Sequence, residues 1–206
     1  LTLVGLKTCS SAIGRCARIL NVHIDSETCW EERVDRGIVA GIVGRYRRSP
    51  NTGRGFVMGR MHDIGSLVLY RQQPDAARQA LQRARDDAIP LQLAEREFLG
   101  FDHSEVGAVL MRAWNLPDSF VEIARHHHQP LSAGRYRLET ASIHLADVIS
   151  GMAHSTGSGT LQTPALEAGA WELTGLSIDI VESVTNEADA QFEEARSALL
   201  SPGRAA

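Results

Sequence analysis

The spacing of apolar side chains constrains the fold of this 206-residue chain more than any other feature of its sequence. Apolar residues recur three and four positions apart in almost every segment, while the alternating runs that favour strands are scarce. Because an α-helix has about 3.6 residues per turn, this spacing gives each segment one apolar face. The sequence therefore predicts an all-α fold whose helices bury these faces against one another.

Start and stop signals divide the chain into helices joined by short connections. Ser26 can cap a helix, and Pro74, Pro90 and Pro117 suit the first turn of one. We expect a loop over 48–55, which is rich in Gly and polar residues, and another over 154–163. The predicted helices cover about 3–20, 26–47, 56 to a bend near Gly65, 74–88, 90–99, 102–114, 117–127, 137–152, a short segment after Pro164, and 178–200.

Charge and apolar run length narrow the classes of partner. The formal net charge is −4, so no overall positive field would hold the chain on nucleic acid or on anionic lipid. Its apolar runs are far shorter than the roughly 20 residues that span a bilayer. Cys9, Cys16 and Cys29 have the spacing of neither a zinc knuckle nor a redox pair, which favours reduced thiols in the cytoplasm. Because the chain lacks a leader pattern and begins without Met in a helical pattern, we expect it to be part of a longer protein.

Several histidines lie beside carboxylates or near predicted helix ends. His62 directly precedes Asp63, His103 begins a predicted helix, and His144 lies one turn before Asp147. Imidazole nitrogens and carboxylate oxygens are ligands that iron, manganese and zinc accept, and helical bundles build metal sites from several helices. From the residues alone, a metal site and ordinary surface, capping or packing roles both stay open.

The order of these residues resembles a known family. The stretch "GRMHDIGSLVLY" resembles the signature of HD phosphohydrolases, and "HLADVIS" supplies the late Asp of HD domains as Asp147. The stretch "EFLGFDHSEVGAVLMRAWNLPDSFVEIARHHHQP" is similar, nearly position for position, to the pattern of HDOD domains, and Glu97 fits its first Glu. This resemblance covers about 30–150 and implies an HD-like helical bundle, the regulatory relative of the metal-dependent HD enzymes.

The resemblance also implies a division of the chain and a set of metal ligands. We expect the tail of a preceding helical lobe over 1–25, the HD-like core over 26–153 and a C-terminal helical extension over 154–206. The implied ligands of a divalent iron, manganese or zinc ion are His62, Asp63, His103, His127 and Asp147, with His128 available to a second metal. Glu32 replaces the first His of the HD pattern, two residues after Trp30, and is either a ligand or a solvent-facing residue.

Two departures from the related HD-GYP phosphodiesterases bear on activity. Ser66 stands where those enzymes carry a Lys after the His-Asp-Ile-Gly run, and "HHHQPLSAGRYR" contains no Gly-Tyr-Pro. The cation that would face a phosphoryl group is thus missing from its place, and we expect no cleavage of cyclic di-GMP. The favoured function is a bacterial signal-transduction module that acts through other signalling proteins, without catalytic residues. The alternative is a metal-dependent phosphohydrolase acting on a nucleotide or another phosphoester.

Four further residues receive structural predictions. Trp30 and Trp114 are predicted to anchor the core, because large aromatic side chains contribute much apolar area. Gly65 is expected to allow the helix to bend after Asp63, since glycine lacks a Cβ. His144 is either a hydrogen-bonding partner of a metal ligand or a packed core residue.

Overall fold

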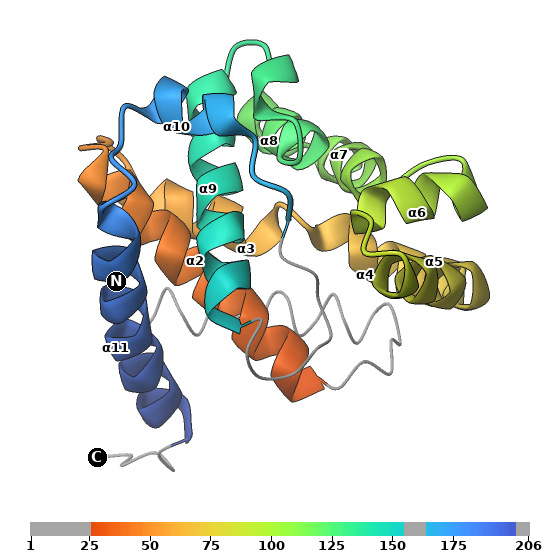
Figure 1. Cartoon of the computed structure of the whole chain (residues 1–206), viewed down its shortest axis with the longest axis horizontal. Helices are drawn as coiled ribbons and strands as arrows, with labels where there is room; N and C mark the ends of the chain where they lie inside the picture. The colour runs from red at the N-terminus through yellow and green to blue at the C-terminus, as the bar shows by residue number, and fades with distance from the viewer. Residues whose placement is uncertain (1–25, 155–163, 201–206) are drawn as a thin grey trace.

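The structure, a computed structural model, describes residues 26–154 and 164–200, and over these ranges it is an all-α, HD-like bundle (Figure 1). The predicted helix over 3–20, the lobe tail over 1–25, Cys9, Cys16 and the side chains of Cys29 and Trp30 lie outside this description. The helices are α2 (Ser26–Tyr46), α3 (Thr52–Met61), α4 (Ile64–Gln72), α5 (Pro74–Asp86), α6 (Leu91–Leu99), α7 (His103–Ala113), α8 (Asp118–His126), the 3-10 turn η1 (Pro130–Ser132), α9 (Arg137–His154), α10 (Ala168–Thr174) and α11 (Ile180–Leu200).

Most predicted helix boundaries agree with the structure to within a few residues, but α3 begins earlier than expected. Its N-terminal cap is Asn51, whose side chain accepts a hydrogen bond from the amide of Arg54 at 3.1 Å. Gly55 and Gly59 lie where α3 packs on α2, and a Cβ at Gly59 would stand 2.6 Å from the carbonyl oxygen of Arg36. Gly55, one of the two glycines that suggested a loop, thus lies within α3, where an added Cβ would stand 3.2 Å from the carbonyl oxygen of Ala40 in α2.

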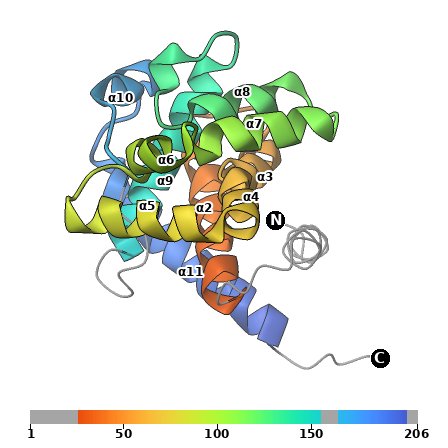
Figure 2. The same ribbon diagram turned by 90° about the vertical axis from the view of Figure 1, so that its right-hand side faces the viewer.

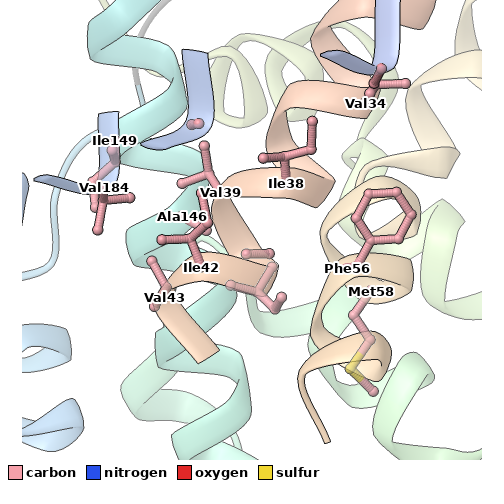
Figure 3. Packing of buried hydrophobic residues seen from close by; sticks show 14 of the residues in the cluster. Val34, Ile38, Val39, Ile42, Val43, Phe56, Met58, Ala146, Ile149 and Val184 are labelled. Atoms are coloured by element: carbon pink, nitrogen blue, oxygen red, sulfur yellow. The ribbon is translucent and has the colours of Figure 1, made fainter. Parts of the chain in front are cut away.

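The main core surrounds α2. Its side chains pack between those of α3, α9 and α11, as Figure 3 shows for Ile38, Phe56 and Val184. The C-terminal helix α11 thereby buries its apolar face in the same cluster as α2. The buried members of this cluster are Val34, Ile38, Val39, Ala40, Ile42, Val43, Phe56, Met58, Ile123, Ile143, Ala146, Ile149, Val184, Ala188 and Ala195.

A second cluster joins α4, α7 and α8, and α5 pairs with α6 at the end of the molecule away from α11 (Figure 1). Figure 2 views the molecule from that end. The prediction for Trp114 is wrong, because its side chain is 43% exposed. Helix α7 ends at Ala113, so Trp114 follows its last turn and does not share the inner face of Met111. Along the described residues, no helix is both long and apolar enough to cross a membrane.

Candidate metal centre

His62 and Asp63 lie at the junction of two helices, since α3 ends at Met61 and α4 begins at Ile64. Gly65 does not make this bend, because it already lies in the first turn of α4. A Cβ at Gly65 would stand 2.0 Å from the carbonyl oxygen of His103 and 2.5 Å from the amide nitrogen of Gly107. Glycine is needed here because the backbones of α4 and α7 touch, and this contact brings Asp63 beside His103.

Three histidines form a cluster next to Asp63. The ligand atoms of His103, His127 and His128 all lie within 4.8 Å of one another. The Nε2 atom of His103 is 2.7 Å from Nε2 of His128 and 3.3 Å from Oδ1 of Asp63. His103 begins α7, where Asp102 and Glu105 form a capping box, and His127 and His128 directly follow α8. The start of α7 and the end of α8 thus bring these three side chains together. We call His103, His127 and His128 the histidine trio.

Glu95, on α6, orients His103 and was missed by the sequence analysis. Its Oε2 accepts hydrogen bonds from Nδ1 of His103 at 2.5 Å and from the amide of His103 at 2.9 Å. Glu97, which the family pattern suggested, is instead exposed and pairs with Arg83. The sequence did contain a signal for Glu95. This residue lies on the same helical face as the apolar Leu91 and Ala94, and a carboxylate on a buried face needs a buried partner.

Two ligand-type atoms at the trio are buried and have no hydrogen-bond partner. Nδ1 of His127 donates to the carbonyl oxygen of Ala124 at 2.8 Å, which leaves its Nε2 as an acceptor without a donor. Oδ1 of Asp63 is also unsatisfied. Buried polar atoms normally have partners, and metal-binding imidazoles normally donate their other N–H to a carboxylate or a carbonyl oxygen. The trio with Asp63 therefore fits a divalent transition metal.

The other implied ligands, His62 and Asp147, lie beside the guanidinium of Arg36. Nδ1 of His62 donates to the carbonyl oxygen of Gly59 at 2.7 Å, and its Nε2 lies 3.6 Å from Oδ1 of Asp147. Arg36 of α2 places Nε 2.8 Å from Oδ1 of Asp147 and Nη1 3.4 Å from Oδ2 of Asp63. We call His62, Asp63, Asp147 and Arg36 the arginine side of the centre. It adjoins the trio, because the ring centroids of His62 and His127 are 4.8 Å apart.

The model of the HDOD domain family matches residues 2–130, which is more than half of the chain. This chain belongs to the HDOD domain family. A curated relative, an uncharacterized protein of Treponema pallidum (strain Nichols), is 21% identical over 127 residues, which are 61% of this chain and 25% of that protein. The HDOD chain thus spans about a quarter of the length of that relative.

Solved structures share the fold of this HDOD chain. An HDOD domain protein with unknown function from Geobacter sulfurreducens has a TM-score of 0.68 and 18% identity, over 86% of this chain and 63% of that one. A Shewanella amazonensis SB2B protein, provisionally named a phosphohydrolase, has a TM-score of 0.67 and 22% identity, over 86% and 65%. The MmoQ response regulator from Methylococcus capsulatus str. Bath has a TM-score of 0.58 and 20% identity, over 78% and 62%.

Protonation in the HDOD centre follows from burial and charge. Burial would raise the pKa of Asp63, but the charges of His103, Arg33 and Arg36 lower it to about 2. Burial would lower the pKa of His103, but Asp63 and Glu95 raise it to about 9. Burial lowers the pKa of His127 to about 3, with help from the neighbouring histidines. At neutral pH the trio therefore contains a neutral His127 and a protonated His103, which must release its proton to bind a metal.

The pKa of Asp147 and that of Arg36 move in opposite directions. Burial would raise the pKa of Asp147, but Arg36 and His62 lower it well below its usual range. Burial would lower the pKa of Arg36, but Asp147 and Asp63 raise it, with a smaller effect from Glu32. Glu32 is half-buried one turn before Arg36 on α2 and acts on the centre through its charge. Its role as a ligand stays a prediction.

An arginine from α2, Arg33, lies beside Ser66, the residue in the place of the Lys. Ser66 Oγ accepts a hydrogen bond from Nη2 of Arg33 at 3.1 Å, and the same nitrogen lies 3.4 Å from the carbonyl oxygen of Asp63. The guanidinium of Arg33 therefore lies near position 66, while Ser66 itself stands in the place of the Lys, as the sequence indicated. Because Arg33 is buried and bonded to these two oxygens, it braces the start of α4.

His144 supports the centre from α9. Its Nδ1 donates to the carbonyl oxygen of His127 at 2.7 Å, and its Nε2 accepts a hydrogen bond from the amide of Glu167 at 3.0 Å. The ring is buried, and burial lowers its pKa. His144 thus combines both roles that the sequence left open, since it packs in the core and holds the backbone of His127.

Proposed function

We propose that this HDOD chain is a cytoplasmic signal-transduction module that acts through protein partners and keeps a degenerate HD-type metal centre. Membership of the HDOD family and the likeness to the MmoQ response regulator support a signalling role. The division of the chain is part of this proposal. The family match from residue 2 supports assigning 1–25 to a preceding lobe, and the burial of Val184 and Ala188 supports an extension folded on the core.

The burial of the centre is the observation that carries the proposal. His62, His103, His127 and Asp147 are between 1% and 4% exposed, whereas His128 is half-buried and the side chain of Asp63 is 17% exposed. A hydrolase must bring a phosphoester to its metal and keep a position there for water. Two of the four proposed ligands, His103 and His127, are deeply buried, which suits a metal that stabilises the fold and leaves access only past His128 and Asp63.

The proposed ligands are the histidine trio and Asp63. Three imidazoles and one carboxylate suit iron, manganese or zinc, and Glu95 and the carbonyl oxygen of Ala124 hold two of the rings in place. When bound, the metal would supply a cross-link between the start of α4, the start of α7 and the end of α8. These residues would hold it without any step of hydrolysis.

Exposed apolar side chains support a role in protein contacts. Phe98 at the end of α6 and Phe101 in the following turn are each at least 40% exposed. Aromatic side chains are enriched where proteins bind one another. The pairing of α5 and α6, with its adjoining turn, is therefore the part of the molecule that we propose for partner binding.

One experiment tests the function. The metal-free protein is loaded with Mn²⁺, Fe²⁺ or Zn²⁺, its metal content is measured, and it is incubated with phosphomonoesters, cyclic nucleotides and cyclic di-GMP. We expect about one metal per chain and no turnover. Metal-dependent hydrolysis that disappears in the Asp63→Ala variant would refute the regulatory function.

The phosphohydrolase remains the second candidate, because a structural relative carries that name and the HD ligands other than the first His are retained, namely His62, Asp63, His103, His127 and Asp147. The same assay separates the two functions. Turnover with any phosphoester of the panel, together with its loss in His127→Ala, would favour the enzyme.

A further inference from the structure

The arginine side of the centre already contains a positive charge where a metal would bind. We propose that Arg36 is a built-in cation that replaces a metal ion between Asp63 and Asp147, so that only the histidine trio is open to metal. This deepens the proposed function, on which it rests in part, because it explains why the centre would hold a single ion.

The position of Arg36 is fixed by backbone packing. Its carbonyl oxygen lies at the contact between α2 and α3, where Gly59 leaves no room for a Cβ. The adjacent Asp35 accepts a hydrogen bond from Ser150, which ties the same turn of α2 to α9. The side chain of Arg36 is only 10% exposed. Its guanidinium is therefore held at the carboxylates from a rigid helix.

The two oxygens of Asp63 face different partners. Oδ2 accepts a hydrogen bond from Nη1 of Arg36, whereas Oδ1 has no hydrogen-bond partner and lies 3.3 Å from Nε2 of His103. One carboxylate thus serves both parts of the centre, with one oxygen for the arginine and one for the histidine trio. Binding of a metal at the trio would leave the contact with Arg36 in place.

A metal on the arginine side would have to displace the guanidinium. Nε of Arg36 forms an ion pair with Oδ1 of Asp147 at 2.8 Å, and the same oxygen lies 3.6 Å from Nε2 of His62. Neither Oδ1 of Asp147 nor Nε2 of His62 has a hydrogen-bond partner, so the charge of Arg36, and not a hydrogen bond, is what opposes a metal here. A transition metal binds a carboxylate oxygen at about 2.0–2.2 Å. Bound to Asp147, the divalent ion would lie next to the positive charge of Arg36, which would repel it. Since arginine stays protonated in proteins, Arg36 cannot remove this repulsion by losing a proton.

The test compares metal content in wild type, Arg36→Ala and a control on the same helix, Arg45→Ala. Both arginines form ion pairs with carboxylates, but the partner of Arg45 is the exposed Glu187 of α11, outside the centre, whereas Arg36 contacts Asp63 and Asp147. At saturating Mn²⁺ we expect the metal-to-protein ratio to rise by one in Arg36→Ala only. Adding Asp147→Asn to Arg36→Ala should abolish that increase.

Stability supplies a second measurement. Without metal, Arg36→Ala should melt about 10 °C below wild type, because two buried carboxylates lose their cation. Added Mn²⁺ should recover most of that loss, whereas Arg45→Ala should melt close to wild type with and without the metal, because its ion pair with Glu187 is exposed.

The outcomes distinguish this inference from the proposed function. A wild type without metal and an Arg36→Ala variant with one ion would refute metal binding at the trio and still support the role of Arg36. An unchanged ratio in folded Arg36→Ala would overturn the inference. So would anomalous scattering that locates Mn²⁺ between Asp63 and Asp147 in wild-type crystals, a measurement that does not depend on whether the variant folds.

Discussion

Replacing Gly65 by Ala should separate α4 from α7 and disturb the metal centre. The added Cβ would stand 2.0 Å from the carbonyl oxygen of His103 and 2.5 Å from the amide nitrogen of Gly107. Both are backbone atoms, so no side chain can rotate away. A normal contact needs at least about 3 Å, and the two helices must therefore move apart by roughly 1 Å.

The magnitude follows from two opposing effects. Ala favours helix over Gly by about 1 kcal/mol. Overpacking typically costs about 1 to 3 kcal/mol and can exceed that where backbone must move. A shift of this size also weakens the packing of Ile64 and Leu67 against Ala108 and Met111. We expect a net loss of about 3 kcal/mol in the free energy of unfolding, or about 10 °C in Tm for a chain of this size.

Gly41 provides the matched control. It lies in the middle of α2, and the nearest atoms to an added Cβ are Phe56 Cβ at 3.8 Å and Thr52 O at 3.9 Å. Gly41→Ala should thus stabilise the protein by about 0.5 to 1 kcal/mol. Urea and thermal denaturation of both variants, followed by metal titration, test the argument. A Gly65→Ala variant as stable as Gly41→Ala, with unchanged metal affinity, would refute the backbone contact that brings His103 to Asp63.

Three other changes have defined outcomes. Glu95→Gln should weaken metal affinity about 10- to 100-fold in a competition titration, because His103 loses its carboxylate partner, whereas exposed Glu97→Gln should leave it unchanged. The metal-free protein should be most stable near pH 6.5 in denaturation series. Below that pH, His127 with a pKa of about 3 makes the folded state bind fewer protons than the unfolded state; above it, His103 with a pKa of about 9 makes the folded state bind more, and stability falls in both directions. Trp114→Ala should cost less than about 1 kcal/mol, since its side chain is 43% exposed, and a loss above about 3 kcal/mol would show it to be a core residue.

The helices and the family could be predicted because their signals are local. The caps and prolines act within one turn, so Asp102 and Pro74 mark helix starts in the sequence and in the structure alike. The HDOD pattern also placed His103 and His127 on segments that the fold brings together. Whether these residues bind metal stays a prediction.

The missed features depend on contacts between distant segments. Arg36 looks like an ordinary helical residue until α4 and α9 bring Asp63 and Asp147 to it. Gly65 suggested a bend, although its reason is the backbone of α7. Spacing along the chain carries no information on such distances, and the same limit explains why Glu97 was chosen over Glu95.

The hydrogen bonds of His144 have a consequence for how the centre communicates with the rest of the molecule. A neutral imidazole has one donor and one acceptor, and here the donor serves the carbonyl oxygen of His127 while the acceptor serves the amide of Glu167. This single ring therefore links the backbone of His127 in the metal centre to the backbone of Glu167, which precedes α10, through two hydrogen bonds. While both hydrogen bonds persist, we expect a shift of the His127 backbone to be accompanied by a shift of Glu167 before α10. In the same way, a change in the position of α10 is expected to alter the position of His127.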